Sequence, residues 1–267
     1  MSKTPYKMYH PASEVQALDT HGQSWHGESL REGIELCSYQ LIEPVFRKYL
    51  SPKDNILEAG CGTGRWVFYL RDLGYNITGI DLAADALRIA HEYDSNAPIH
   101  SDDILHTSYP DGSFNAIISL GVVEHFEEGP QAAFREAYRL LKNDGYFLVT
   151  VPLQNFNRTF LSNPMKEFKR WMKQRKGVRY LFEEYRYTRK EFSDLLNQGN
   201  FEIIDMEPDD FQTPKNIGLW VDFPFFRHPD KKWELNGLGK AYRSFFSIFS
   251  PWLTCAGSLW ICKKKNT

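Results

Sequence analysis

A glycine-rich segment, ILEAGCGTGRW at residues 56–66, holds the residue types best suited to bind an organic cofactor. An apolar run ends in Glu58, and Gly60, Gly62 and Gly64 then precede a helix-like stretch. Glycines at such a turn let the chain reverse tightly and let a ligand lie against main-chain amides. The G-x-G-x-G spacing differs from the G-x-G-x-x-G of dinucleotide-binding turns, which disfavours a nicotinamide or flavin dinucleotide.

Acidic residues follow the next two expected strands. ITGID ends in Asp81, where a carboxylate can accept both hydrogen bonds of a ribose diol. Asp81 could instead cap the helix that follows, although its place beside the glycine loop favours the ribose role. In HSDDI, Asp102 or Asp103 could accept the amine of an adenine ring while Ile104 donates its backbone N–H to a ring nitrogen. Either acid could equally be a solvated loop residue.

His125 is the best-placed candidate for proton transfer. It follows a fourth apolar run that ends near Leu120, where open α/β sheets bind ligands. Imidazole titrates near neutral pH, so His125 could serve as a general base toward a hydroxyl or a protonated amine. With equal weight, Glu124 and His125 could merely cap and pack the following turn. No cysteine or histidine shows metal-ligand spacing, so we expect no metal.

The ordered set of segments closely resembles the class I S-adenosylmethionine-dependent methyltransferases, above all the small-molecule group that includes quinone-biosynthesis enzymes. The resemblance covers roughly residues 50–207 and rests on ILEAGCGTGRW, TGIDLA, SDDILHTSYPDGSFNAIISLGVVEHF, REAYRLLKNDGYFLVTVP and EYRYTRKEFSDLL. It implies that the glycine loop cradles the methionine end, that Asp81 holds the ribose and that Asp103, counted back from PDGSF, holds the adenine amine. Asn115 stands where the family usually has Asp, at the start of a strand.

S-adenosylmethionine is therefore the expected cofactor and S-adenosylhomocysteine the product. The residues expected to contact the cofactor are Glu58, Gly60, Cys61, Gly62, Gly64, Asp81, Leu82, Asp102, Asp103, Ile104 and Leu120.

Short apolar runs alternate with helix-like stretches up to about residue 152, which predicts parallel strands joined by crossover helices. We expect a doubly wound, mostly parallel α/β sheet, and the resemblance gives it seven strands, the last one antiparallel and formed by GSLWICKKK. The expected strands are 55–58, 76–80, 99–101, 115–120, 146–151, 201–207 and 258–263, and the expected helices are 65–73, 83–93, 130–141 and 188–198. Thr188 and Glu191 predict a capping box, and Gly199 ends that helix.

Four parts are expected along the chain. Residues 1–50 form a helical segment that covers the cofactor, and 51–152 form the cofactor-binding core. Residues 153–184 form a basic, aromatic cap without a strand pattern, and 185–267 complete the sheet around a second aromatic insertion at 208–250. Trp25 or His26 could close the site, or Trp25 could simply anchor the first helix.

Charge and composition limit the partners. A formal net charge of -2 provides no general attraction to nucleic acid, which we do not expect as a partner. The basic cap could attract a phosphate, a carboxylate or a membrane surface, or it could be a solvated lid face. Residues 244–262 carry no charge, but Pro251 and the polar residues among them favour a helix, a turn and a buried strand over a membrane span. Four scattered cysteines and the lack of an export signal predict a cytoplasmic protein.

The leading hypothesis is methyl transfer to a small or lipid- or glycan-linked acceptor, at oxygen. The alternative is a cofactor-binding module without catalysis that regulates or scaffolds other proteins. The sequence leaves the acceptor and the oligomeric state open.

Overall fold

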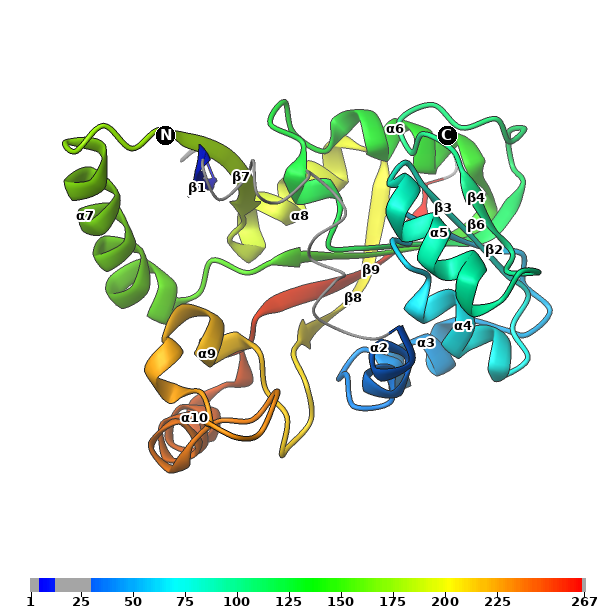
Figure 1. Cartoon of the computed structure of the whole chain (residues 1–267). Helices are drawn as coiled ribbons and strands as arrows, with labels where there is room; N and C mark the ends of the chain where they lie inside the picture. Colours follow the sequence, from blue (N-terminus) through cyan, green and yellow to red (C-terminus); the bar gives the residue numbers. More distant parts are fainter. Residues whose placement is uncertain (1–4, 13–29, 266–267) are drawn as a thin grey trace.

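A seven-stranded sheet forms the centre of the computed structural model, which describes residues 5–12 and 30–265 (Figure 1). In spatial order its strands are β4 (Ile99–Ser101), β3 (Ile77–Asp81), β2 (Ile56–Ala59), β5 (Phe114–Leu120), β6 (Leu141–Pro152), β9 (Gly257–Lys264) and β8 (Phe201–Asp209). Neighbours from β4 to β6 run parallel, and β9 runs antiparallel to both β6 and β8. The expected fold class and the antiparallel last strand are confirmed.

Helices cover both faces of the sheet. One face carries α2 (Leu30–Cys37), α3 (Glu43–Tyr49), α4 (Arg65–Asp72) and α5 (Ala84–Tyr93), and the other carries α6 (Gln131–Leu140) and α8 (Arg189–Gln198). Phe46 and Trp66 pack on the first face with ring centroids 4.8 Å apart, and Phe134 and Phe192 pack on the second at 5.8 Å. Because both faces are covered, the central strands are continuous apolar runs in the sequence.

The sequence placed most of these elements to within two residues. Thr188 caps α8, the reciprocal hydrogen bonds with Glu191 form the expected capping box, and Gly199 follows the helix as its C-cap. Strand β6 begins five residues earlier than expected, because Leu141 pairs with Phe114 before an irregularity in the register.

A small second sheet corrects two of the expectations. Strand β1 (Tyr6–Pro11) pairs antiparallel with β7 (Tyr180–Arg186), so the first 50 residues are not only helical and the cap does contain a strand. The pairing joins Tyr6 to Arg186, and no local pattern reports a partner so distant in sequence. Trp25 and His26 lie outside the described residues.

The remaining segments lie on one side of the sheet and, together with β7, make up the cap, which thus combines the expected basic cap with the second aromatic insertion. They are the π-helical turn Arg158–Ser162, α7 (Asn163–Gln174), α9 (Gly218–Asp222), the short turns Pro224–Phe226 and Pro251–Leu253, and α10 (Gly237–Phe249). The uncharged stretch 244–262 forms the end of α10, a turn at Pro251 and the start of β9, as expected. Among the described residues, no helix has both the length and the apolar character needed to cross a bilayer.

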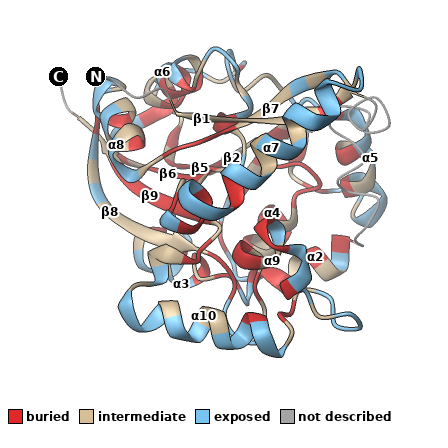
Figure 2. Ribbon diagram, turned by 90° about the vertical axis from the view of Figure 1, so that its left-hand side faces the viewer, coloured by how far each residue is buried: buried red, intermediate tan, exposed pale blue. Residues whose placement is uncertain are grey.

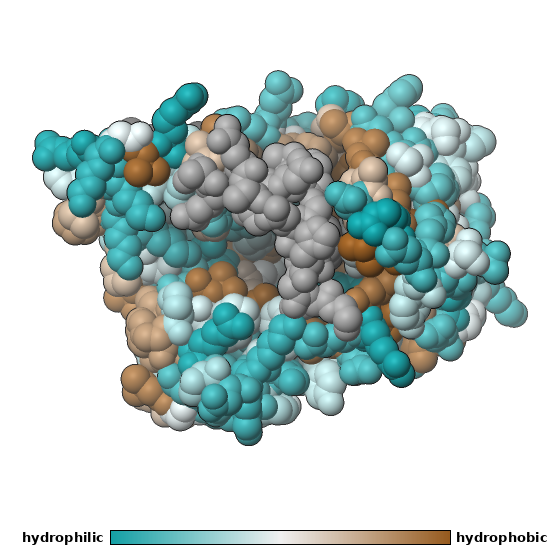
Figure 3. Space-filling model, viewed as in Figure 1, coloured by the Kyte–Doolittle hydropathy of each residue, from teal (hydrophilic) through white to brown (hydrophobic). Residues whose placement is uncertain are grey.

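Burial differs between the sheet and the cap. Buried residues concentrate on the strands, whereas α7 and α10 are exposed over much of their length (Figure 2). In the view of Figure 3, apolar atoms gather along the left-hand edge, the side on which Figure 1 places these two helices.

Candidate active site

Four parallel strands bring the predicted site residues to one edge of the sheet. Glu58 on β2 lies opposite Gly79 on β3 and Ile118 on β5, and Asp81 at the end of β3 lies opposite Ser101 on β4. The loops that follow β2, β3, β4 and β5 therefore leave the sheet at its carboxyl edge, where open α/β sheets bind ligands.

The glycine loop is fixed to the end of β3. The backbone N–H groups of Gly60 and Cys61 donate to the Ile80 carbonyl at 2.8 and 2.9 Å, and the Gly62 N–H donates to Asp81 Oδ2 at 2.7 Å. Asp81 Oδ1 accepts from the Ala83 N–H at 2.8 Å at the start of α5, so the carboxylate serves both the loop and the helix. Each carboxylate oxygen can accept a second hydrogen bond, which leaves room for a diol.

Gly60 and Gly64 are required by both conformation and space. Their φ angles are +82° and +79°, in the left-handed region that favours glycine. A Cβ on Gly60 would lie 2.6 Å from a Val122 methyl group, and one on Gly64 would overlap Ile99. The Cys61 side chain packs under the loop toward Gly79, so Cys61 offers only its main chain to a ligand.

Glu58 is buried, and its Oε2 has no hydrogen-bond partner among the described residues. Burial raises the pKa of Glu58 to about 8, and the nearby Arg65 guanidinium opposes this only in part. A buried carboxyl group without a partner is costly unless a ligand supplies a donor. The site therefore fits a ligand that brings a charged amino group beside the glycine loop.

The two adjacent acids after β4, Asp102 and Asp103, have different roles. Asp102 accepts the Asp103 N–H on Oδ1 at 2.9 Å, and on Oδ2 it accepts the N–H and hydroxyl of Ser108 at 3.0 and 2.8 Å. Asp103 uses only Oδ1 within the described part of the chain, for the Leu105 N–H at 2.9 Å. Asp102 therefore shapes the loop, whereas Asp103 keeps an oxygen for a ligand. Leu82 is exposed beside Asp81, and Leu120 ends β5 half-buried.

His125 is positioned by the cap. Its Nδ1 lies 2.8 Å from the Glu183 carbonyl oxygen on β7, which can only accept, so Nδ1 carries the proton and Nε2 is left with a lone pair in the neutral ring. Burial lowers the pKa of His125, but the Glu124 carboxylate and the bond to Glu183 outweigh it, and the net direction is upward. Burial itself raises the pKa of Glu124 to about 7. This geometry suits a general base.

Sequence reasoning missed a further acid near this edge. Strand β8 continues two residues beyond its expected end to Asp209, whose Oδ1 has no partner among the described residues. Desolvation, then the neighbouring Asp210 charge, raises the pKa of Asp209 to about 7. The run MEPDD resembles a loop, and only pairing with Gly257 on β9 extends the strand that far.

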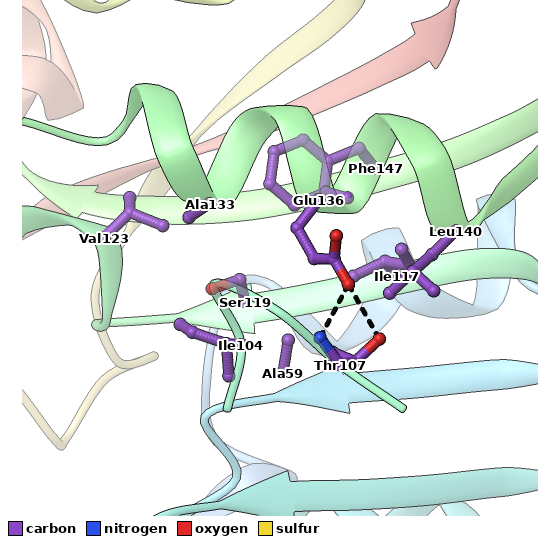
Figure 4. Close-up of a pocket in the computed structure, with 11 residues that line it drawn as sticks. Ala59, Ile104, Thr107, Ile117, Ser119, Val123, Ala133, Glu136, Leu140 and Phe147 are labelled. Carbon is purple, nitrogen blue, oxygen red and sulfur yellow. Dashed lines mark hydrogen bonds between the residues drawn. The ribbon is translucent and has the colours of Figure 1, made fainter. Parts of the chain in front are cut away.

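A narrow apolar pocket between the sheet and α6 adjoins the loop after β4 (Figure 4). Ile104 lines it, and Glu136 Oε1 accepts the N–H and the hydroxyl of Thr107 at 2.7 and 2.8 Å. Arg139 also binds this carboxylate, so Glu136 is a structural acid that holds the loop bearing Asp103. No group of three or more potential metal ligands occurs in the part of the chain that the structure describes.

Comparisons with known proteins find methyltransferases among the matches. A family model described as a methyltransferase domain matches residues 57–149. The phosphoethanolamine N-methyltransferase of Plasmodium falciparum is 28% identical over 160 residues, which cover 58% of this chain and 56% of that protein. The ubiquinone biosynthesis O-methyltransferase of Glaesserella parasuis is 31% identical over 134 residues, 45% of this chain and 55% of its own. The chain thus spans about half the length of these two relatives.

A solved structure extends the likeness of fold beyond the matched domain. The S-adenosylmethionine-dependent methyltransferase of Methanosarcina mazei superimposes with a TM-score of 0.60 at 19% identity, covering 84% of this chain and 98% of that one. At this identity the likeness concerns the fold, including the seven-stranded sheet.

Proposed function

We propose that this chain, whose residues 57–149 form an S-adenosylmethionine-dependent methyltransferase domain, transfers a methyl group to a small or lipid- or glycan-linked acceptor. The observation that carries the proposal is the hydrogen bond from Gly62 N–H to Asp81, which joins the glycine loop and the acid after the second core strand into one cradle. When bound, S-adenosylmethionine supplies an electrophilic methyl group, and the residues around it bind, orient and exclude water.

In this proposal each free polar group of the site binds a different part of the cofactor. Glu58 accepts from the ammonium of the methionine part, which supplies the donor that its buried Oε2 lacks. Asp81 accepts from the ribose hydroxyls, and Asp103, not Asp102, accepts from the adenine amine, since the Asp102 oxygens already hold the loop. The remaining contacts come from the main chain of Gly60, Cys61, Gly62, Gly64 and Ile104 and from the side chains of Leu82 and Leu120.

We assign the acceptor atom to oxygen. A hydroxyl is a weak nucleophile until it loses its proton, and His125 Nε2 carries the lone pair that can take it. Glu124 then stabilises the imidazolium that forms, because its charge already raises the His125 pKa. A new bond forms between the acceptor oxygen and the methyl carbon as the carbon–sulfur bond breaks, and the acceptor's proton remains on His125.

Labelled cofactor tests both the reaction and the atom. The full chain would be incubated with methyl-labelled S-adenosylmethionine and either prenylated catechols and hydroquinones or phosphoethanolamine. We expect label in the oxygen acceptors and a loss of about 100-fold in kcat for His125→Gln at pH 7, with no change for His91→Gln on the exposed side of α5. If label were transferred to phosphoethanolamine alone, the acceptor atom would be nitrogen and the assignment to oxygen would be wrong. Binding of cofactor without transfer to either class would favour the non-catalytic module.

A further inference from the structure

Helix α7 turns apolar side chains away from the body of the protein. Met165, Phe168 and Met172 follow one another at intervals of three and four residues, so they share one side of the helix, and all three are exposed. Phe168 is 58% exposed and stacks with the neighbouring, half-exposed Trp171 at a centroid distance of 6.0 Å.

The polar side of α7 faces the protein instead. Lys166 binds Asp222 at 2.8 Å, Glu167 accepts the Tyr6 hydroxyl at 2.8 Å, and Arg170 lies over the Tyr9 ring at 4.6 Å. A surface helix of a globular protein ordinarily does the reverse, with its apolar stripe inward and its charges in water. Helix α7 is therefore oriented like a helix whose outer side contacts an apolar environment.

Helix α10 repeats this orientation. Phe245 and Phe249 are four residues apart on its outer side, Ile248 lies beside them, and Leu238 extends the stripe toward the start of the helix. Ile248 is 80% exposed and Phe249 is 69% exposed, which is unusual for two large apolar residues at the end of one helix.

The two helices share one side of the molecule and are connected through residues 157–158 and α9. The left-hand side of Figure 1, which faces the viewer in Figure 2, carries both, and Figure 3 shows apolar atoms along the same edge. The Tyr242 hydroxyl of α10 donates at 3.0 Å to Asn157 Oδ1, just before the π-helical turn that leads into α7. Arg158 binds Asp222 at 2.6 Å and so ties the same segment to α9. The segments that carry the apolar side chains are thus tied to one another by buried polar contacts.

The basic residues near the stripe on α7 indicate which kind of partner this surface would bind. Residues 153–182 contain eight Lys or Arg and one acid, although the whole chain has a net charge of -2. Lys169 and Lys173 are exposed along one flank of the α7 stripe, Lys176 is exposed just past the end of the helix, and the Arg175 guanidinium lies 4.3 Å from the centroid of the Trp171 ring. An apolar stripe with a Trp and flanking cations suits the headgroup level of an anionic bilayer.

We propose that the outer sides of α7 and α10 form a membrane-docking surface that inserts its apolar side chains among the headgroups of an anionic lipid bilayer. The surface is independent of methyl transfer. Only its consequence for the acceptor rests on the proposed function: a docked chain would draw a lipid-linked acceptor from the bilayer into the site beneath the cap.

Vesicle sedimentation of the full chain tests the surface without cofactor or acceptor. The vesicles would contain phosphatidylcholine alone, or phosphatidylcholine and phosphatidylserine in equal parts. We expect strong binding to the mixed vesicles only. Phe245→Ser/Ile248→Ser and Lys169→Glu/Lys173→Glu should each weaken that binding by about tenfold or more. All four positions are exposed, and circular dichroism would verify that each variant folds.

Matched controls change the same residue types elsewhere. Ile204→Ser on β8 and Lys53→Glu/Lys190→Glu alter exposed side chains outside both helices and should leave binding unchanged. Failure of the wild-type chain to bind mixed vesicles, or equal losses in the controls, would overturn the proposal. So would a dimer that the Phe245→Ser/Ile248→Ser variant dissociates, because the stripe would then belong to a second copy. Loss of methyl transfer with vesicle binding intact would count against the proposed function alone.

Discussion

Buried charges are paired differently in the cofactor half, residues 51–152, and in the cap. In the cofactor half, Glu58 is buried with an oxygen that nothing in the described chain satisfies. In the cap, Asp222 is equally buried but accepts from Arg158, Arg186 and Lys166, and these contacts hold its pKa far below the usual range despite desolvation. The first arrangement leaves an acceptor open for a ligand, whereas the second is complete in itself. We infer that the cofactor half is shaped to bind a ligand and that the cap is held together by its own ion pairs.

Removal of Asp222 should have the largest effect and should separate the two halves. Asp222→Ala leaves three cations without their carboxylate, and breaking a buried ion pair in this way costs about 3–5 kcal/mol of stability. Hydrogen exchange should rise in residues 153–186 and 210–250, while cofactor affinity stays unchanged.

Glu136→Ala is the matched control in the other half. This acid is also buried and paired with an arginine, but it holds the loop that bears Asp103. It should weaken cofactor binding and leave exchange in the cap unaltered. If both variants loosen both halves alike, the distinction between them fails.

A smaller effect, with a pH signature, is expected at Glu58. The pKa of Glu58 is about 8 in the folded chain, above its ordinary value of 4.5, so the folded state holds this proton more tightly than the unfolded state does. Stability contributed by the protonated group is present below pH 4.5 and is lost as the pH rises toward 8. Glu58→Gln removes that loss and should therefore stabilise the ligand-free chain at pH 8, with a gap that closes toward pH 5.

The same substitution should reduce affinity for S-adenosylmethionine by about tenfold, because the ammonium loses its charged acceptor. Thermal melts would measure stability and calorimetry would measure cofactor affinity, each from about pH 5 to about pH 8. A constant difference in melting temperature at every pH would show that Glu58 is not the titrating group.

The smallest expected effect separates two neighbouring acids. Asp103→Ala should weaken cofactor binding by about tenfold and should lower the melting temperature less than Asp102→Ala does, because it removes only one internal hydrogen bond, from the Leu105 N–H, together with the free oxygen. Asp102→Ala should lower stability by about 1–2 kcal/mol, since it removes the acceptors for Ser108 and for the Asp103 N–H. The reverse pattern would exchange the two roles.

The structure of the cofactor half could be predicted from the sequence more fully than that of the cap. The cofactor half is built from consecutive strand, loop and helix units, so the glycine loop and Asp81 could be placed from local pattern alone, as could the Thr188 capping box. The choice between Asp102 and Asp103 could not, because adjacent residues do not reveal which side chain holds its own loop.

The cap depends on contacts between distant segments. Strand β7 forms against β1 and so brings the Glu183 carbonyl to His125, and Asp209 reaches the site edge only because β9 extends β8. The outward stripe on α10 was equally hidden, since periodicity shows that a helix is amphipathic but not which side meets the protein.

Calorimetric titration of S-adenosylmethionine into the wild-type chain and into Asp81→Ala tests the central claim most directly. Asp81 joins the glycine loop to the end of β3 and supplies the expected ribose acceptor, so its loss should weaken binding by about 100-fold, while a circular dichroism spectrum shows the fold retained. Micromolar binding by the wild type, weakened by about 100-fold in the variant, is the predicted result. A folded wild-type chain that binds no S-adenosylmethionine, or a variant that binds it equally well, would contradict the account.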